Sequence, residues 1–301
     1  MDARARVIPM ILVWQQEKVE RLVYWMQERE RIRIRKERGD PPPWTDDPIL
    51  REWRFCNLDR MDDRVSRWVH QYVVALYRDD PALWHALVVA RLVNWPPTLL
   101  HWRLVNGGVT WDAGRFVDLL ETLARRGEKV FTSAYVVPAG PRGIPKARHL
   151  AAAVLSPLWD ARGEFPRPRE GTCALWADLL SCVSGLGPFL ANQVVADLKY
   201  TPYLDRAPDR GTFALAGPGT RRGLNRLLGR PLEAAWSQAD AGAALLDLRL
   251  RVVPLAPELG EKLGEMNNLS NVACELDKYE RVRLGEGKPR QRYVPSSEPM
   301  P

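Results

Sequence analysis

Apolar positions recur at intervals of three and four residues along most of the chain, which is the spacing of helices that bury one face. Two stretches show it most clearly, RVSRWVHQYVVALY at residues 64–77 and PALWHALVVARLVNW at residues 81–95, with Asp79 and Asp80 between them. Few segments alternate apolar and polar residues as strands do. The pattern therefore predicts a mainly α protein.

The first long helix is expected at residues 10–38, where an apolar beginning gives way to the strongly charged ERERIRIRKER. Gly39 and the prolines at 41–43 end it, because glycine closes helices and proline cannot continue them. Its basic end is either a phosphate-binding surface or a solvated helix face. Further helices are expected after a cap at residues 45–48 and at 97–104, 112–126, 145–160, 171–183, 188–199, 223–230, 231–248, 256–263 and 275–283.

One compact helical region is expected between an arm and a tail. Residues 1–44 form the basic N-terminal helical arm, and residues 45–285 form the compact region. AYVVPAGPRGIPK at residues 134–146 is expected to be a hairpin or loop. Residues 286–301 are a basic tail, rich in Pro, Ser, Lys and Arg, that is expected to be partly disordered.

The net charge of the chain indicates what kind of molecule it binds. The 301 residues carry a net charge of +7, and most of the basic side chains are arginines. Arginine makes bidentate contacts to phosphates and base edges, so a polyanion such as DNA is favoured. A GC-rich genome that inflates the arginine content is the alternative explanation.

Cysteine and histidine spacing argues against a metal centre. The four cysteines form no Cys-x-x-Cys pair, and His70, His85, His101 and His149 form no cluster, so neither a metal nor another cofactor is expected. No signal peptide and no run of 18 apolar residues occurs, which favours a cytoplasmic, monomeric protein with free thiols and no membrane contact. The twelve tryptophans are expected mainly in the core.

The segment LSCVSGLGPFLANQVV at residues 180–195 joins two apolar helices through a very tight turn. Gly185 and Gly187 let the backbone approach a phosphate, and Pro188 starts the second helix. This segment, within residues 172–199, resembles the helix-hairpin-helix motif of base-excision DNA glycosylases. That resemblance implies sequence-independent binding to the DNA backbone, and a helical hairpin without a ligand is the alternative.

The same resemblance gives meaning to three further residues. Phe189 occupies the place of the lysine that forms a Schiff base in strand-nicking members, which implies base removal by water. Asp209, twenty residues further on, is the preferred catalytic carboxylate, and Asp205 is the second candidate. A carboxylate there would stabilise an oxocarbenium-like sugar. A loop aspartate that supports a turn is the alternative.

Several longer strings point to one family: ERERIRIRKERGDPPPWTDDPILREWRFCNLDRMDDRVSRWV, ARLVNWPPTL, FTSAYVVPAG, GLGPFLANQVVADLKY, FALAGPGTRRGL and CELDKYERVRLGEGKPRQRY. Over residues 28–293 the chain resembles the helical domain of 5-hydroxymethyl-deoxyuridine DNA kinases, also named α-glutamyl/putrescinyl thymine pyrophosphorylase. This implies a glycosylase-like helical fold that acts on DNA with hypermodified pyrimidines. The family includes kinases, amino-acid:DNA transferases and an antiphage glycosylase that excises glucosylated hydroxymethylcytosine. The chain has no Gly-x-x-x-x-Gly-Lys-Ser/Thr P-loop.

Two sets of residues follow from these matches. The strongest string supplies a candidate base pocket, because asparagine reads a pyrimidine edge and arginine binds phosphate or sugar. A buried polar network that holds the arm to the core is the alternative. The base-pocket set is Arg54, Asn57, Arg60, Asp63, Phe189 and Gln193, and the DNA-binding set is Gly185, Gly187, Arg221, Arg222, Lys278 and Arg281.

Three functions compete at this point. The favoured one is a monofunctional DNA glycosylase, in antiphage defence, that flips out and excises a hypermodified pyrimidine from double-stranded DNA. The second is a transferase that joins an amino acid or a polyamine to activated 5-hydroxymethyluracil in phage DNA. The third is a DNA-binding module without catalysis.

Overall fold

The structure is a computed structural model that describes residues 12–106, 109–132 and 140–293, although the side chains of residues 105 and 106 lie outside the description. Helices make up the regular structure of these residues, and an isolated bridge between Trp53 and Arg292 is their one β-type pairing. The predicted mainly α class is confirmed. By their contacts the described residues divide into two units, residues 12–59 with 214–293 and residues 60–213.

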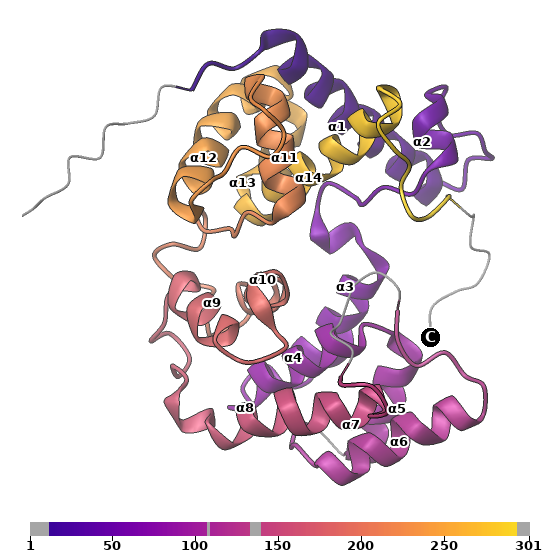
Figure 1. The fold of residues 1–301 in the computed structure, drawn as a ribbon, viewed down its shortest axis with the longest axis vertical. Helices are drawn as coiled ribbons and strands as arrows, with labels where there is room; N and C mark the ends of the chain where they lie inside the picture. Colours follow the sequence, from indigo (N-terminus) through magenta and orange to yellow (C-terminus); the bar gives the residue numbers. More distant parts are fainter. Residues whose placement is uncertain (1–11, 107–108, 133–139, 294–301) are drawn as a thin grey trace, which may run out of the picture. The chain divides into compact units, whose positions relative to one another are not determined.

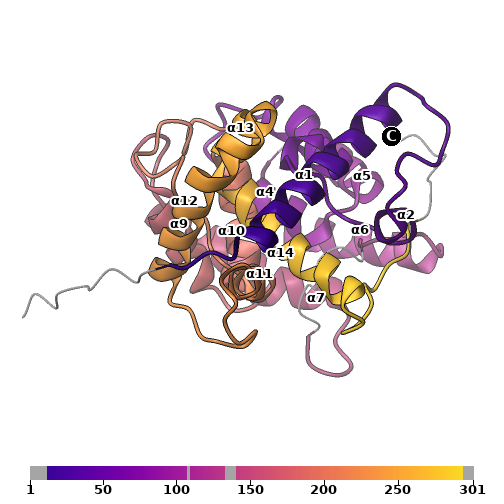
Figure 2. The same ribbon diagram turned by 90° about the horizontal axis from the view of Figure 1, so that it is seen from above.

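The first unit is built around α14, which packs against α1, α11, α12 and α13 (Figure 1). Seen from above, α1 lies beside α14 and α11 (Figure 2). Its helices are α1 (Gln16–Glu37), α2 (Pro48–Glu52), α11 (Pro218–Leu228), α12 (Gln238–Leu255), α13 (Gly260–Gly264) and α14 (Met266–Arg283), with a 3-10 turn, η5 (Pro257–Leu259), before α13.

α1 is part of this core, so the contacts do not divide the chain at the expected boundaries 44/45 and 285/286. Leu22, Trp25 and Met26 are fully buried in the cluster that also holds α12 and α14 residues. The expected helix at 10–38 is observed from Gln16, and residues 10 and 11 lie outside the described ones. Helix α1 thus places its apolar side on the core and its Arg and Glu side chains mostly around the edge.

The α11–α14 contact is unusually close because two glycines face α14. A Cβ atom on Gly223 would lie 2.0 Å from the carbonyl oxygen of Ala273, and one on Gly219 would lie 2.3 Å from Sγ of Cys274. Since these glycines are four residues apart, they lie on one face of α11. Helix axes approach more closely where no side chain intervenes.

Helix α12 begins later than the expected 231–248. It starts after Ser237, whose hydroxyl accepts a hydrogen bond from the amide of Asp240 and caps the helix. Residues 231–236 instead form a turn in which Asn225 Nδ2 donates to the carbonyl oxygens of Leu232 and Ala234. Trp236 is buried there and donates from Nε1 to Asn225 Oδ1. Residues 231–236 are therefore held as a turn by the burial of Trp236 and by the hydrogen bonds of Asn225, and the helix begins after them.

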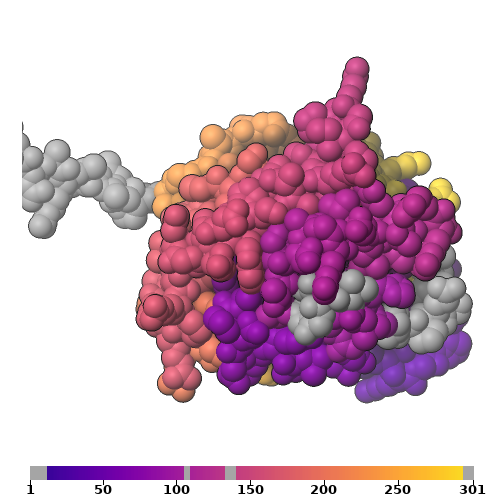
Figure 3. All heavy atoms as spheres, turned by 90° about the horizontal axis from the view of Figure 1, so that it is seen from below, coloured from indigo at the N-terminus to yellow at the C-terminus, as the bar shows by residue number. Residues whose placement is uncertain are grey.

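The second unit surrounds α4, whose residues are nearly all buried and which packs against α5, η2, η3 and α10. Its surface appears in purple, magenta and salmon in Figure 3. Its elements are η1 (Arg60–Asp62), α3 (Arg64–Val69), the π-helix η2 (His70–Val74), α4 (Leu83–Val93), α5 (Pro96–Asn106), α6 (Ala113–Arg125), α7 (Lys146–Leu150), the π-helix η3 (Ala151–Leu155), α8 (Ser156–Asp160), η4 (Arg162–Glu164), α9 (Cys173–Ser181) and α10 (Gly187–Leu198).

The predicted helices of this unit are observed with small shifts. The 81–95 helix is α4, which ends at Asn94 in the left-handed region, with φ 48°. The 112–126 helix is α6, capped by the Asp112 carboxylate. The 64–77 and 145–160 segments both continue from α-helix into a π-helical turn, which periodicity does not reveal. The expected hairpin or loop at residues 134–146 falls largely outside the described residues.

Candidate nucleic-acid site

The turn between α9 and α10 is tight because two glycines adopt backbone angles that other residues rarely take. Gly185 has φ +90° and Gly187 has φ +56°. A Cβ atom on Gly185 would lie 2.9 Å from Cγ2 of Val154, so the turn also fits against a neighbouring helix. Helices α9 and α10 pack against each other along their buried faces. The predicted pair of helices joined by a tight turn is therefore present.

The two helices begin differently. The hydroxyl of Thr172 caps α9 by accepting from the amide of Leu175, whereas no side chain caps α10. A helix start without a side-chain cap is an arrangement that suits an anion. Phe189, in the first turn of α10, is 49% exposed. This turn can therefore bind a phosphate at the start of α10 and contact a ligand through the ring of Phe189.

Asp209 lies against the start of α9. Its Oδ1 accepts from the amide of Cys173 at 2.8 Å, and its Oδ2 accepts from the amide of Ala174 at 2.9 Å. These two hydrogen bonds fix the orientation of the carboxylate and satisfy amides that have no partner within the helix. The preferred catalytic residue of the sequence prediction therefore has a helix-capping contact, and its catalytic role stays a prediction.

Asp205 is held more loosely. Its Oδ2 lies 3.6 Å from Nη2 of Arg78, whose side chain is 47% exposed. The other oxygen, Oδ1, is buried and has no hydrogen-bond partner among the described residues. Since a carboxylate oxygen accepts protons and hydrogen bonds, Asp205 is the less saturated of the two candidate carboxylates.

Two residues of the predicted base pocket contact each other, and one of them, Arg60, pairs with a buried aspartate that sequence reasoning missed. Arg60 donates from Nε to Oδ1 of Asp197 at 3.1 Å and from Nη2 to the carbonyl oxygen of Gln193 at 3.0 Å, and it also contacts the Gln193 side chain. Arg91 donates from Nη2 to Asp197 Oδ1 at 2.6 Å. These are the contacts of a buried polar network, and the base-pocket role of Arg60 and Gln193 stays a prediction.

Asp197 is ionised despite complete burial. Burial alone would raise the pKa of this carboxyl, but the charges of Arg60 and Arg91 outweigh burial and hold the pKa well below its usual range. His70 Nε2 lies 3.7 Å from Asp197 Oδ1 at the start of the π-helical turn η2. Such turns frequently occur at functional sites.

The remaining base-pocket residues are divided between the units. Arg54 and Asn57 belong to the first unit, where Arg54 Nη1 donates to Gln291 Oε1 at 3.4 Å and Asn57 Oδ1 accepts from Arg29. Asp63 belongs to the second unit, as Phe189 does, and immediately precedes α3. Each unit thus holds part of the predicted set.

The predicted DNA-binding arginines of α11 and α14 face a shared carboxylate. Asp277 lies 3.3 Å from Nε of Arg222, 2.7 Å from Nε of Arg226 and 3.4 Å from Nε of Arg281. Lys278 Nζ lies 2.8 Å from Glu275 Oε2, and Arg221 Nε donates to the carbonyl oxygen of Ala216 at 3.1 Å. Much of this predicted basic surface is therefore already paired within the protein.

Metal ligands do not gather in the part of the chain that is described. No group of three or more His, Cys, Asp or Glu side chains there is placed to hold a metal ion. His85 is fully buried, and burial lowers its pKa to about 4, while Nε2 lies 2.9 Å from the carbonyl oxygen of Leu155. Among the described helices, none combines the length and the hydropathy needed to traverse a bilayer.

A family model described as "5-hmdU DNA kinase, helical domain" matches residues 16–289. The chain belongs to this family. The match covers both units, so the family comprises the α1 and α14 core as well as the α9–α10 hairpin. The expected kinship with these kinase helical domains is confirmed, whereas the likeness to glycosylases stays a prediction.

One curated relative comes from a bacteriophage. The chain is 27% identical over 219 residues to the 5-hmdU DNA kinase of Bacillus phage SP10, which covers 65% of this chain and 34% of the relative. The chain thus matches about a third of the length of that protein. No solved structure matches the chain.

Proposed function

We propose that this chain acts on hydroxymethylated pyrimidines in DNA, in a group-transfer step of base modification. Membership in the kinase helical-domain family carries the proposal, since the phage relative is named for DNA that contains 5-hydroxymethyl-deoxyuridine. The net charge of +7 and the α9–α10 turn with an uncapped second helix support DNA as the substrate. The base would leave the stack to react.

Phosphoryl transfer from ATP is not proposed for these residues. The 301 residues contain no Gly-x-x-x-x-Gly-Lys-Ser/Thr sequence to hold a nucleoside triphosphate. The proposed step instead uses a hydroxymethyl group that already carries a phosphate ester. An amine nitrogen attacks the exocyclic methylene carbon, the carbon–oxygen bond breaks, and the phosphate leaves with the bonding electrons.

The nitrogen must then lose a proton. Asp205 is the candidate acceptor, because its Oδ1 has no hydrogen-bond partner among the described residues. Asp209 is the second, although both of its oxygens already accept amide hydrogens. Gly185 and Gly187 would hold the DNA backbone through the turn between α9 and α10.

A glycosylase is the second candidate. Phe189 cannot form a Schiff base, and Asp209 follows it by twenty residues with its carboxylate fixed in one orientation. In this reaction Asp209 would stabilise the sugar cation while water attacks C1′, as in glycoside hydrolysis. A bulky base such as glucosylated hydroxymethylcytosine in phage DNA is the proposed substrate of this alternative.

One assay separates the two reactions. The full chain is incubated with duplexes that contain 5-hydroxymethyluracil, its phosphate ester or glucosylated hydroxymethylcytosine, each with and without glycine or putrescine. Nucleoside digests are analysed by mass spectrometry, and parallel samples are treated with alkali. A heavier nucleoside that needs both the ester and the amine supports group transfer. Alkali-labile strands with no amine requirement support the glycosylase and overturn group transfer.

Matched variants identify the carboxylate. Asp205→Asn is expected to lower group transfer at least a hundredfold, because the asparagine amide cannot accept the proton. Asp112→Asn is the control, since Asp112 also caps a helix of the second unit by accepting from the amide of Arg115. If Asp209→Asn abolishes activity and Asp205→Asn does not, the proton acceptor is Asp209. Equal activity in all variants contradicts both assignments.

A further inference from the structure

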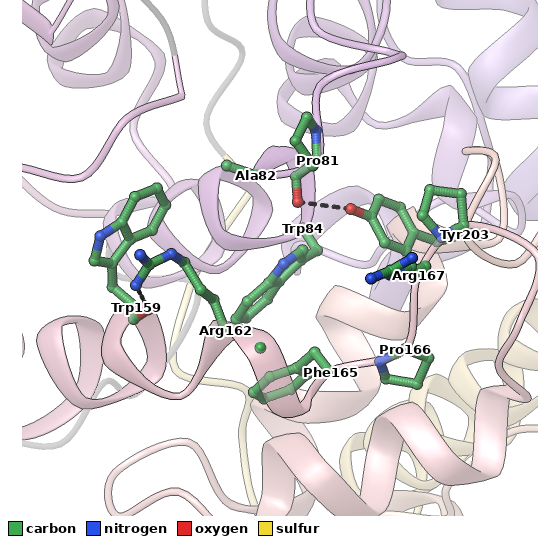
Figure 4. A pocket seen from close by; sticks show the side chains of 11 residues that line it. Pro81, Ala82, Trp84, Trp159, Arg162, Phe165, Pro166, Arg167 and Tyr203 are labelled. Atoms are coloured by element: carbon green, nitrogen blue, oxygen red, sulfur yellow. Dashed lines mark hydrogen bonds between the residues drawn. The ribbon is translucent and has the colours of Figure 1, made fainter.

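The second unit contains a pocket of about 340 Å³ that no function described above uses. It is lined by residues that precede and begin α4, by α8 and η4, by the loop before α9 and by the turn after α10. Figure 4 shows Arg162 beside Trp159 at one end of the pocket and Arg167 near Tyr203 at the other. Its volume is at the small end of the range for small-molecule sites.

The floor of this pocket is aromatic and rigid. Trp84 and Phe165 stack with ring centroids 4.2 Å apart and an interplanar angle of 21°. The hydroxyl of Tyr203 donates to the carbonyl oxygen of Pro81 at 2.7 Å. Burial and the charge of Asp80 raise the pKa of Tyr203 to about 12, so this donor stays protonated. A floor that is fixed beforehand loses little entropy on binding.

The charged residues in the lining of this pocket are both arginines. Arg162 and Arg167 line it, and no carboxylate belongs to its lining. The Arg162 guanidinium lies 5.0 Å from the centroid of the Trp159 ring and donates from Nη1 to the Trp159 carbonyl oxygen at 2.8 Å. Neither arginine forms an ion pair with a described residue, unlike Arg60 and Arg91 of the same unit.

These features select one ligand chemistry. Exposed faces of aromatic rings and guanidinium groups stack on nucleobases, and arginine binds phosphate. Phe165 and Trp159 are the partly exposed rings, whereas Trp84 is buried against Phe165. A polyamine would meet two positive charges with no carboxylate to balance them. An uncharged apolar ligand would leave both arginines without an anion.

We propose that this pocket binds a single nucleotide of a DNA strand, with its base against the aromatic floor and its phosphate on one of the two arginines at the ends of the pocket, Arg162 or Arg167. The assignment to a DNA strand rests on the proposed function, whereas the nucleotide chemistry rests on the pocket alone. A free nucleotide has the same chemistry, so the test includes both sources.

Calorimetric titration of the full chain tests the pocket without any catalytic step. Thymidine monophosphate, thymidine, spermidine and a single-stranded oligothymidylate are the probes. The double variant R162Q/R167Q is expected to bind the monophosphate and the oligonucleotide at least tenfold more weakly than the unchanged protein does. Arg169→Gln is the control, because Arg169 is an exposed arginine of the same loop that does not line the pocket.

The aromatic part has a separate test. Phe165→Leu is expected to weaken the binding of thymidine monophosphate about tenfold, because one stacking contact with the base is lost. The binding of inorganic phosphate is expected to stay unchanged. Unchanged thermal unfolding of each variant shows that the fold is intact.

Three outcomes would overturn the proposal. Equal monophosphate affinity in the double variant and the unchanged protein overturns the nucleotide site. Loss of the monophosphate alone, with oligonucleotide binding unaffected, overturns the assignment to DNA and leaves a free-nucleotide site. Spermidine that competes with the monophosphate overturns the charge argument. Failure of the proposed function gives a different result, namely normal binding here and no altered nucleoside in the modification assay.

Discussion

Asp197 of the second unit and Asp277 of the first are both buried aspartates that face arginines, but solvent reaches their partners differently. The side chains of Arg60 and Arg91 around Asp197 are 13% and 2% exposed. Around Asp277, Arg281 is 35% exposed. The first cluster is therefore closed to solvent, whereas the second is open at its outer edge.

The difference decides what each cluster can do. A buried arginine that neutralises a carboxylate in a low dielectric is not available to a phosphate. A half-exposed one can exchange its carboxylate for a phosphate, since surface ion pairs contribute little. The number of arginines thus overstates how many positive charges are available to bind DNA. Of the two clusters, the one around Asp277 on α11 and α14 is the more accessible to a phosphate.

The largest expected effect comes from Asp197→Asn. This change leaves two guanidinium groups buried with one fewer negative charge, so the free energy of unfolding of the second unit is expected to fall by about 3–5 kcal/mol. Hydrogen exchange of α4 and α10 amides, read by mass spectrometry, measures it. Exchange of α14 amides serves as the internal reference. A loss below 1 kcal/mol would contradict the closed character of the cluster.

Acid is expected to destabilise the second unit more than the first, since all four histidines lie between residues 70 and 149. The pKa of His85 falls from 6.5 to about 4 on burial, so the unfolded chain takes up a proton that the folded one excludes. This contribution is full above pH 6.5 and is lost as pH falls towards 4. The expected loss is on the order of 3 kcal/mol.

Denaturant titrations between pH 7 and pH 4.5 measure this effect with exchange of α4 amides as the readout. His85→Gln should flatten the pH dependence of the second unit, because glutamine does not titrate. The pKa of Asp197 is also lowered in the folded protein, although by the charges of arginines and against the effect of burial. Its contribution to the free energy of unfolding therefore also falls with pH, but only below the ordinary pKa of 3.8. An unchanged slope in His85→Gln would show that another group is responsible.

Asp277→Asn is expected to cost about 1–2 kcal/mol in the first unit, less than its counterpart, because water reaches Arg222 and Arg281 and solvates them. The same variant should bind duplex DNA more tightly, since the released arginines can contact phosphate. Fluorescence anisotropy at two salt concentrations measures this. If Asp277→Asn destabilised the protein as much as Asp197→Asn does, the proposed difference in solvent access between the two clusters would be contradicted.

The smallest effect is expected at Asp209. Asp209→Asn should lower stability by about 1 kcal/mol, as the loss of a charged helix cap does, and Asp112→Asn should lower it by a similar amount. Thermal unfolding of the two variants gives the comparison. A much larger loss at Asp209 would mean that its carboxylate holds more than the start of α9.

Helices and turns could be predicted from the sequence because their signals are local. Periodicity placed α4, and the spacing of Gly185, Gly187 and Pro188 placed the turn before α10. Asp197 was missed because its partners, Arg60 and Arg91, are 137 and 106 residues away. No local pattern distinguishes an aspartate on a buried helix face from one on the surface.

The segment AGPGTRRG at residues 216–223 makes a helix contact that its own sequence does not reveal. Arg221 and Arg222 of this segment were assigned to DNA, and a helix was expected only from residue 223. In the structure Gly219 and Gly223 lie inside α11 and face α14. Their role depends on a helix that follows fifty residues later, which spacing within the segment cannot reveal.

The touching backbones of α11 and α14 fix the register between these helices. Because a Cβ atom on Gly223 would lie 2.0 Å from the Ala273 carbonyl oxygen, neither helix can slide past the other without passing a side chain through this point. The ion pairs of Asp277 therefore follow from the alignment and do not set it. The charges along this pair of helices can change during evolution while the frame that carries them stays in place.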